Sequence, residues 1–254
     1  MLAILSPAKN FNHTTINSVP LSTPVFKNEA NNIINELRLL SVDELSELYK
    51  SSETIAHTNF LRFQNWTKNP RKEGLLTSLR AFAGEAYRGL NASTFTDDQM
   101  IKADKLIRIL SGMYGILRPL DGIQSYRLEI GTQWGGVGYK NLYERWSEKV
   151  TKELNKSIYN SPGDKILVNL ASNEYFKVIN RKQFKYPVLT IEFKEELNGK
   201  LKTVVVYAKK ARGMMARYIV ENDLKNKNDL KGFNMDGYCF SNEYSLDGNW
   251  VFYR

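Results

Sequence analysis

The spacing of apolar and polar residues predicts helices over much of the first half of the chain. Ser41–Glu44 has the pattern of a capping box, in which a hydroxyl and a carboxylate satisfy free backbone N–H groups at the start of a helix, and apolar residues follow at helical spacing. The same pattern recurs at Thr96–Gln99, ahead of apolar positions that continue at helical spacing to Leu110. A third helix is predicted to open at Asn141 and to continue to about Leu154.

Strands and helices alternate in the second half. The nearly continuous apolar run over 165–171 is typical of a strand buried on both faces, and Ser172 or Asn173 is placed to cap a short helix after it. Asn198 and Gly199 predict a tight hairpin turn, because both central positions of such a turn need a positive φ. The remaining pattern predicts strands over 187–193, 201–207, 237–240 and 250–253, and a helix over about 209–222.

The apolar segment Leu2–Leu5 predicts a first strand that is far in sequence from the other strands. If it pairs with them, one sheet connects the two halves of the chain. We therefore predict an α+β fold in a single domain over residues 1–254, with a mixed sheet, helices packed on it and a helix-rich N-terminal half.

Basic residues outnumber acidic residues. The 254 residues include 36 Lys and Arg against 27 Asp and Glu, which gives a formal net charge of +9. This excess favours polyanionic partners, namely nucleic acid, an anionic membrane surface or phosphorylated small molecules.

Few residues in this sequence are suited to bind a transition metal. Cys239 is the only cysteine, and His13 and His57 are the only histidines, so we expect no disulfide framework, no metal and no cofactor. The apolar segment at residues 1–5 lacks a basic leader and is too short for a signal peptide, and no stretch approaches the ~18–20 apolar residues of a membrane span. We therefore expect a cytoplasmic protein with no membrane partner.

One predicted helix carries much of the positive charge. No acidic residue occurs between Glu196 and Glu221, whereas this segment contains six basic ones. Projection at ~100° per residue places Ala211, Met214, Met215, Tyr218 and Ile219 on an apolar face, Lys209, Lys210, Gly213 and Arg217 on the opposite face, and Arg212 at its margin. This pattern fits contact with phosphates, with the glycine allowing close approach. The alternative is a solvated surface, which is the usual role of a run of charges.

The usual signatures of catalysis are absent from the sequence. It contains no phosphate-binding loop motif, no nucleophile elbow and no zinc-protease helix motif. A weak nuclease-like pattern remains in Asp164 followed by Glu192 and Lys194, in which carboxylates hold a divalent metal and a lysine orients water. Such a loose pattern also arises by chance.

Five segments carry a family resemblance. They are LSPAK at 5–9, LSGMYGILRPLD at 110–121, YRLE at 126–129, NLASNEYF at 169–176 and YAKKARG at 207–213. Together they resemble the YaaA family of bacterial peroxide stress resistance proteins, and the resemblance runs from Met1 to the region of Tyr253.

The resemblance implies a cytoplasmic protein with a single, unusual α+β fold. It implies a positively charged cleft that binds double-stranded DNA and a helix–hairpin–helix-like element. The implied role is protection against hydrogen peroxide, through lower free iron and hence less Fenton damage to DNA and protein. The resemblance implies no established enzymatic activity, so whether the chain is an enzyme stays open.

The family's helix–hairpin–helix element has one candidate here, the segment 110–115, which follows a capped helix. A hairpin of this kind presents backbone N–H groups to a phosphate. The spacing of Gly112 and Gly115 differs from the usual one, and Pro119 shortens any second helix. A tight turn that closes the preceding helix is the alternative.

We expect little sequence preference in DNA binding, because the candidate contacts suit phosphates. The candidates are Lys9, Gly112, Tyr114, Gly115, Arg118, Arg127, Lys209, Lys210, Arg212, Gly213 and Arg217. Buried ion pairs, such as one between Arg118 and Asp121, are the alternative for Arg118 and Arg127. The rival function is an enzyme acting on nucleic acid or a nucleotide, with a pocket near Lys9, Glu129, Asn173 and Glu174.

Overall fold

The centre of the fold is a mixed sheet that draws strands from both halves of the chain. The computed structural model describes residues 1–13 and 19–254. The strands lie in the order β11 (Cys239–Leu246), β12 (Asn249–Tyr253), β9 (Val188–Leu197), β8 (Leu167–Asn169), β1 (Leu2–Leu5), β5 (Ile107–Ser111) and β6 (Gly115–Leu117), and β10 (Lys200–Lys202) pairs with β9. The five strands from β12 to β5 are parallel, and the outer strands β11 and β6 are antiparallel to their neighbours. The predicted mixed sheet is therefore confirmed.

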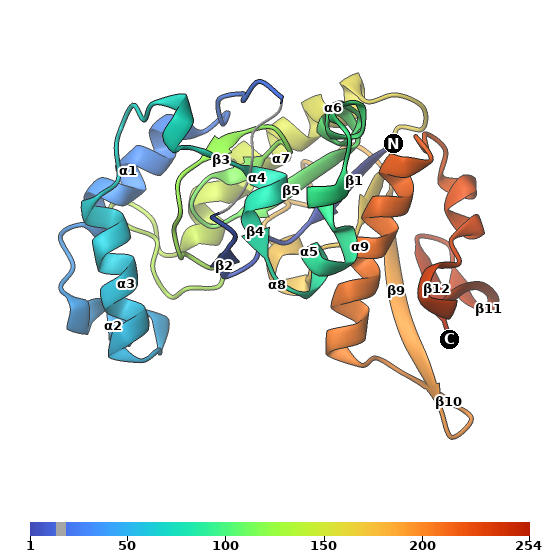
Figure 1. Ribbon diagram of the computed structural model, residues 1–254. Helices are drawn as coiled ribbons and strands as arrows, with labels where there is room; N and C mark the ends of the chain where they lie inside the picture. The colour runs from blue at the N-terminus through green and yellow to red at the C-terminus, as the bar shows by residue number, and fades with distance from the viewer. Residues whose placement is uncertain (14–18) are drawn as a thin grey trace.

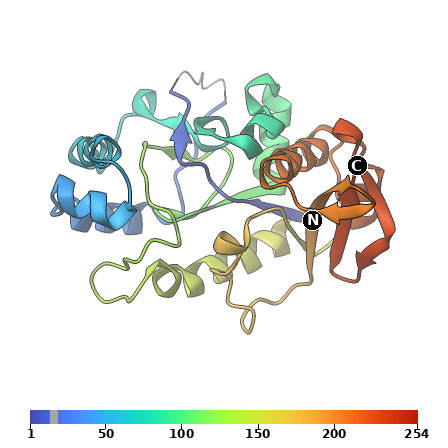
Figure 2. The ribbon, with the colours of Figure 1, turned by 90° about the horizontal axis from the view of Figure 1, so that it is seen from below.

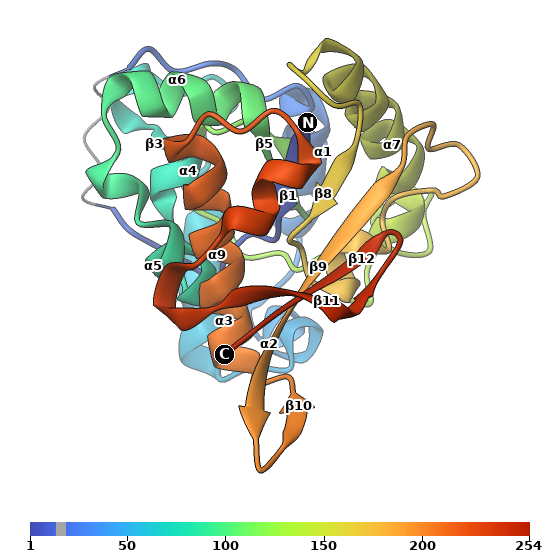
Figure 3. The same ribbon diagram turned by 90° about the vertical axis from the view of Figure 1, so that its right-hand side faces the viewer.

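The first strand lies in the interior of this sheet. Ala3 pairs with Ile107 of β5 on one side and with Val168 of β8 on the other. All residues of β1 and β8 are buried, as expected of parallel strands covered on both faces. Figure 3 shows β9 running beyond the sheet into the hairpin with β10.

Helices cover both faces of the sheet, and most of them come from the first half. They are α1 (Lys27–Leu37), α2 (Val42–Tyr49), α3 (Glu53–Gln64), α4 (Ser78–Ala81), α5 (Glu85–Leu90), α6 (Asp97–Leu106), α7 (Leu142–Asn160), α8 (Asn173–Phe176) and α9 (Val205–Glu221). Short 3-10 helices are η1 (Lys72–Gly74), η2 (Ala92–Thr94), η3 (Lys227–Gly232) and η4 (Met235–Gly237), and two small strand pairs join β2 (Asn10–Phe11) to β4 (Phe82–Ala83) and β3 (Leu76–Thr77) to β7 (Gly122–Ile123). Figure 2 shows α9 and α5 on one side of β1 and α7 on the other, and α1 to α3 form a separate group in Figure 1.

The helix starts predicted from capping residues are confirmed. The Ser41 hydroxyl accepts a hydrogen bond from Glu44 N at 3.2 Å, and the Glu44 carboxylate accepts one from Ser41 N at 2.7 Å. Thr96 forms the same box at the start of α6, and the side chains of Asn141 and Ser172 cap α7 and α8. Polar residues at these positions satisfy N–H groups that the helix leaves free.

Two predicted boundaries are wrong. Residues 107–110 continue the apolar spacing of the helix before them, yet they form β5, because there they pair with the backbone of β1. Residues 203–207 suit a strand by composition, yet α9 already begins at Val205, since Ala208 and Ala211 pack inward as part of the helix. In both places tertiary contacts outweigh local preference.

A continuous cluster of buried apolar side chains includes residues of both halves, from Met1 to Phe252. The single domain over residues 1–254 stays our prediction. No helix in the described part of the chain is long and apolar enough to cross a membrane.

Candidate functional site

A pocket of about 360 Å³ lies at the carboxyl ends of β1 and β8. The strand order runs outward from β1 to β5 on one side and from β8 to β9 on the other, so the order reverses between β1 and β8. Ligands of open α/β sheets bind at such a reversal, outside the carboxyl ends of the strands. Here the loops after the two strands are joined, because Ser6 Oγ accepts a hydrogen bond from Ser172 N at 2.9 Å. In Figure 1 the neighbouring elements β2, α5, α8 and α9 converge between α3 and β9.

Tyrosine and leucine side chains give the pocket an apolar part. Tyr87, Tyr126, Tyr175, Leu128 and Leu170 are buried and line the pocket. The Tyr87 hydroxyl donates to the Ser6 carbonyl at 3.0 Å, and the Tyr126 hydroxyl is 2.6 Å from Ser111 Oγ. Burial raises the pKa of all three tyrosines well above the ordinary value of 10.0, so these groups stay neutral.

Four cationic side chains from three separate segments line the same pocket. Lys9 follows β1, Arg127 lies in the loop after β7, and Lys209 and Arg212 lie on α9. Lys9, Arg127 and Lys209 are each more than eighty residues apart in sequence, so only the fold brings them together. Because cations that share one concavity add their fields, the pocket is suited to an anion.

Lys9 and Arg127 share an acidic partner. Lys9 Nζ lies 3.0 Å from Glu129 Oε1, and Arg127 Nη2 lies 3.2 Å from the same oxygen. The carbonyl of Arg127 accepts a hydrogen bond from the Tyr49 hydroxyl at 2.6 Å, and its guanidinium lies over the Tyr49 ring at 5.9 Å. Nε of Arg127 is buried and has no hydrogen-bond partner among the described residues.

Lys209 and Arg212 have no such partner. Within the described ranges 1–13 and 19–254, neither forms an ion pair within 4.0 Å, and Nε of Arg212 is buried without a hydrogen-bond acceptor. Burial lowers the pKa of the Arg212 guanidinium, and the charge of Glu192 offsets part of this effect. An arginine remains charged at neutral pH even so, so α9 presents two unpaired cations to the pocket.

The acidic residues of the pocket are already engaged. Glu129 is held by Lys9 and Arg127 as described above, Glu85 pairs with Arg88 at 2.7 Å, and Glu174 Oε1 accepts a hydrogen bond from Gly131 N at 3.1 Å. Lys9, Glu129 and Glu174 all line this pocket. The alternative prediction of an enzyme expected these three residues to converge. Asn173 opens α8 and lies outside the set of lining residues.

The other basic residues of α9 lie away from the pocket. Lys210 pairs with Asp236 at 3.1 Å. Arg217 donates to the carbonyls of Leu90 and Asn91 and pairs with Glu221 at 2.6 Å. The predicted single basic face is thus divided, because adjacent helical residues differ in direction by about 100°.

Gly213 is buried, so its predicted place on an exposed basic face is wrong. A Cβ at this position would lie 1.7 Å from the carbonyl oxygen of Ala86 in α5. Gly89 of α5 is similarly close to α9, with 2.0 Å between its would-be Cβ and the Lys210 carbonyl oxygen. The two glycines therefore allow two helices to touch backbone to backbone, and Gly213 serves packing.

The segment 110–115 contains the end of β5 and the turn into β6 of a β-hairpin, so its interpretation as a helix–hairpin–helix element is wrong. Gly112 and Tyr114 lie in the buried turn between β5 and β6, and the Gly112 carbonyl accepts a hydrogen bond from Trp146 Nε1 at 2.8 Å. Gly115 has a φ of +68° and packs against the Trp146 ring. The backbone N–H groups of this turn are enclosed by the core and do not form the N-terminus of a helix.

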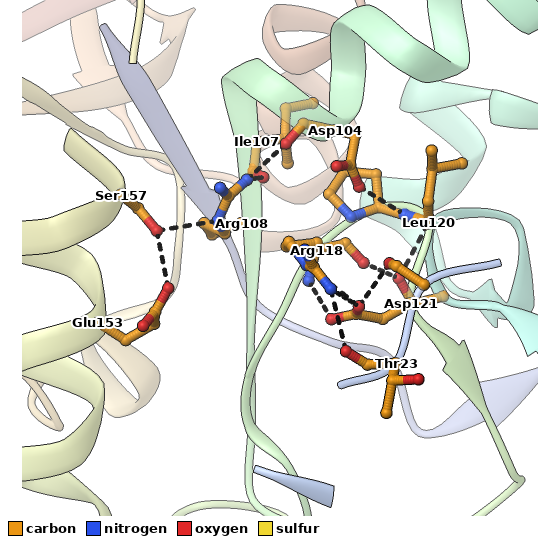
Figure 4. A network of polar contacts seen from close by, with 12 residues as sticks. Thr23, Asp104, Ile107, Arg108, Arg118, Leu120, Asp121, Glu153 and Ser157 are labelled. Carbon is orange, nitrogen blue, oxygen red and sulfur yellow. Dashed lines mark hydrogen bonds and ion pairs between the residues drawn. The ribbon is translucent and has the colours of Figure 1, made fainter. Parts of the chain in front are cut away.

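Arg118 is part of a buried polar network, shown in Figure 4. Its Nη2 and Nε lie 2.9 and 3.2 Å from Asp121 Oδ1, and Nη2 also donates to the Thr23 carbonyl. Asp121 is fully buried and accepts further hydrogen bonds from Ser22 Oγ and Arg118 N. The contacts agree with the predicted alternative of a structural ion pair.

The nuclease-like pattern does not assemble. Asp164 accepts a hydrogen bond from Lys227 N at 2.7 Å, whereas Glu192 and Lys194 pair with each other at 3.2 Å on β9. No group of three or more His, Cys, Asp or Glu side chains that suits a metal ion occurs among the residues that the structure describes.

Sequence reasoning missed several lining residues, including the three tyrosines, Ser172 and Glu85. Ser6 and Ser172 could have been predicted from their positions after β1 and β8, because residues that follow buried parallel strands gather at one edge of a sheet. The tyrosines carried no such signal, since their alternating or isolated positions are equally typical of an ordinary core.

Comparisons with known proteins show one family. The model of the family described as "Peroxide stress protein YaaA" matches residues 1–244. A UPF0246 protein of Clostridium perfringens (strain ATCC 13124) is 42% identical over 258 residues, and one of Flavobacterium psychrophilum is 40% identical over 255 residues. Each alignment covers 100% of both chains.

Proposed function

Because the chain belongs to the peroxide stress protein YaaA family, we propose that it acts in the cytoplasm to protect cells from hydrogen peroxide by binding double-stranded DNA. The membership confirms the resemblance carried by the five sequence segments. Binding has little sequence preference and helps to limit iron-driven damage. The observation that carries the DNA part of the proposal is the gathering of Lys9, Arg127, Lys209 and Arg212 around one concave site.

The structure changes which cations we propose as contacts. Lys209 is exposed, and neither Lys209 nor Arg212 has an acid within ion-pair distance among the described residues. Lys9 and Arg127 line the same site but share Glu129 as their acidic partner. Arg118, Lys210 and Arg217 are each held by an acidic neighbour, so a phosphate would have to displace that neighbour. Contacts to phosphates release counterions and carry no sequence information, which supports binding without sequence preference.

The test is duplex binding measured by fluorescence polarisation across a salt series. Each neutralised phosphate contributes ~0.9 to the slope of log K against log salt. The double variant Lys209→Ala/Arg212→Gln should therefore bind more weakly and lose about 1.8 from the slope. Lys210→Ala is the matched control, since it removes the adjacent lysine of the same helix, which is paired with Asp236. Unchanged affinity in the double variant, or an equal loss in the control, would refute the proposed contacts.

One observation favours the second candidate function, an enzyme that acts on nucleic acid or a nucleotide. Lys9, Glu129 and Glu174 line the same pocket, as that function requires. An enzyme would convert its ligand, so chromatography of the binding mixtures would show product, and Glu129→Gln should abolish its formation.

A further inference from the structure

We infer that the pocket at the carboxyl ends of β1 and β8 holds one nucleotide, with its phosphate at Lys209 and Arg212 and its base over the tyrosine and leucine side chains. The inference deepens the proposed function and rests on it, because the same two cations receive phosphate in both. It differs from duplex binding in requiring an enclosed site for a single unit.

The size of the pocket suits a small organic ligand. Pockets that bind such ligands have volumes of ~300–1,000 Å³, and this one has about 360 Å³. That volume is sufficient to enclose one mononucleotide and too small to enclose a duplex. The site also lies where the strand order of the sheet reverses, the place at which sheets of this kind bind nucleotides.

The unpaired charge lies on one wall. Lys209 and Arg212 are three residues apart on α9 and so project from neighbouring positions of the helix. Arg212 lines the pocket and has no ion-pair partner among the described residues, so an anion that binds there need not displace an acidic neighbour of Arg212. The planar guanidinium binds phosphate through two parallel hydrogen bonds, and the lysine adds a point charge.

Other lining residues of the pocket offer acceptors and apolar surface. Glu129 lies in the loop after β7, and Glu174 lies in α8. The contacts described above engage Oε1 of each, and the second carboxylate oxygen accepts hydrogen bonds from sugar hydroxyls or base amino groups. The buried side chains of Tyr87, Tyr126 and Leu128 add a surface on which an aromatic base can pack. A bare phosphate would use only the two cations of α9, whereas a nucleotide would also use these acceptors and apolar side chains.

The first test measures binding of three probes to the full chain by calorimetry. AMP should bind with one site per chain, and both inorganic phosphate and adenosine should bind at least about tenfold more weakly, because each lacks one half of the contacts. Arg212→Gln and Lys209→Ala should each weaken AMP binding by about 10- to 100-fold, the range expected for loss of a charge-assisted hydrogen bond. Lys210→Ala should bind AMP like the wild type.

Lys209 is exposed, so its variant tests the site even if Arg212→Gln fails to fold. The inference would be overturned if AMP showed no saturable binding or if phosphate bound as tightly as AMP. It would also be overturned if Lys209→Ala and Lys210→Ala affected AMP binding equally.

A second test shows whether the nucleotide is free or is the end of a DNA strand. It also distinguishes failure of this inference from failure of the proposed DNA binding. Blunt duplex and duplex with a 5′-phosphorylated single-stranded overhang are each titrated with and without AMP. If the pocket holds a nucleotide at a strand end, the chain should bind the duplex with the overhang more tightly than the blunt duplex. AMP should then compete with the overhang for binding. If AMP binds and neither DNA does, the proposed function fails and a free nucleotide is the ligand. If both DNAs bind equally and AMP competes with neither, the pocket inference fails and duplex binding stands.

Discussion

Replacing Gly213 with alanine tests whether the close contact between α5 and α9 sets the position of the pocket cations. The new Cβ would lie 1.7 Å from the Ala86 carbonyl oxygen, whereas real Cβ atoms essentially never approach a heavy atom within 3.0 Å. The two helices must therefore separate locally by about 1.3 Å, the difference between these distances. Sliding does not relieve the clash, because Gly89 makes the reciprocal contact with the Lys210 carbonyl.

The expected loss of stability follows from two opposing effects. Overpacking of a core typically costs about 1–3 kcal/mol, and a clash with backbone belongs at the upper end of that range. Alanine favours a helix over glycine by about 1 kcal/mol, so the net loss in the free energy of unfolding is about 2 kcal/mol. With an m-value of about 2 kcal/mol per molar urea, the midpoint of unfolding falls by about 1 M.

The assay is urea unfolding followed by circular dichroism, combined with AMP titration of the folded variant. Gly74→Ala is the control, because a Cβ at Gly74 would have no heavy atom within 4 Å, and its stability should stay within about 0.5 kcal/mol of the wild type. Since Lys209 and Arg212 move with α9, Gly213→Ala should also weaken AMP binding. An unfolding midpoint equal to that of the wild type, with unchanged AMP affinity, would refute the reasoning.

Two further predictions concern the polar network of Figure 4. Arg118→Met leaves the fully buried carboxylate of Asp121 without its cation, so the free energy of unfolding measured in urea should fall by about 3 kcal/mol, and the double variant Arg118→Met/Asp121→Asn should recover part of that loss. Burial raises the pKa of Asp104 above its ordinary 3.8, so the folded state binds this proton more tightly than the unfolded state. The resulting contribution to the free energy of unfolding is present below pH 3.8 and is lost as the pH rises through the folded pKa. Asp104→Asn removes this dependence, so its stability relative to the wild type should rise with pH above 3.8 in a series of thermal unfolding curves; a constant difference across the series would contradict the assignment.

Much of the local structure was predictable because local chemistry determines it. Ser41 and Thr96 carry hydroxyls that accept hydrogen bonds from free N–H groups of their own helices, and this requirement is independent of tertiary contacts. The apolar run over 165–171 indicated a strand because a continuous apolar stretch must be covered on both faces, and β8 lies within it.

The errors occurred where local preference and tertiary contacts disagree. The spacing at 107–110 fits a helix and a buried strand equally well, and only the pairing of Ile107 with Ala3 favours the strand. The glycines of the segment 110–121 suggested an exposed loop for phosphate, yet Gly112 and Gly115 are needed for close packing against Leu128 and Trp146. Glycine permits both uses, so its presence alone does not distinguish them.

The sequence by itself determined the excess of positive charge, the capped helix starts, the mixed sheet and the family of this protein. Only the tertiary structure decided which cations act together. Lys209 lines the pocket while its neighbour Lys210 pairs with Asp236, because consecutive helical residues point about 100° apart. Lys9 and Arg127 join Lys209 because strands and loops distant in sequence end at one edge of the sheet. The charge of a residue is a local property, whereas the partner of that charge depends on which segments the fold brings within a few ångströms.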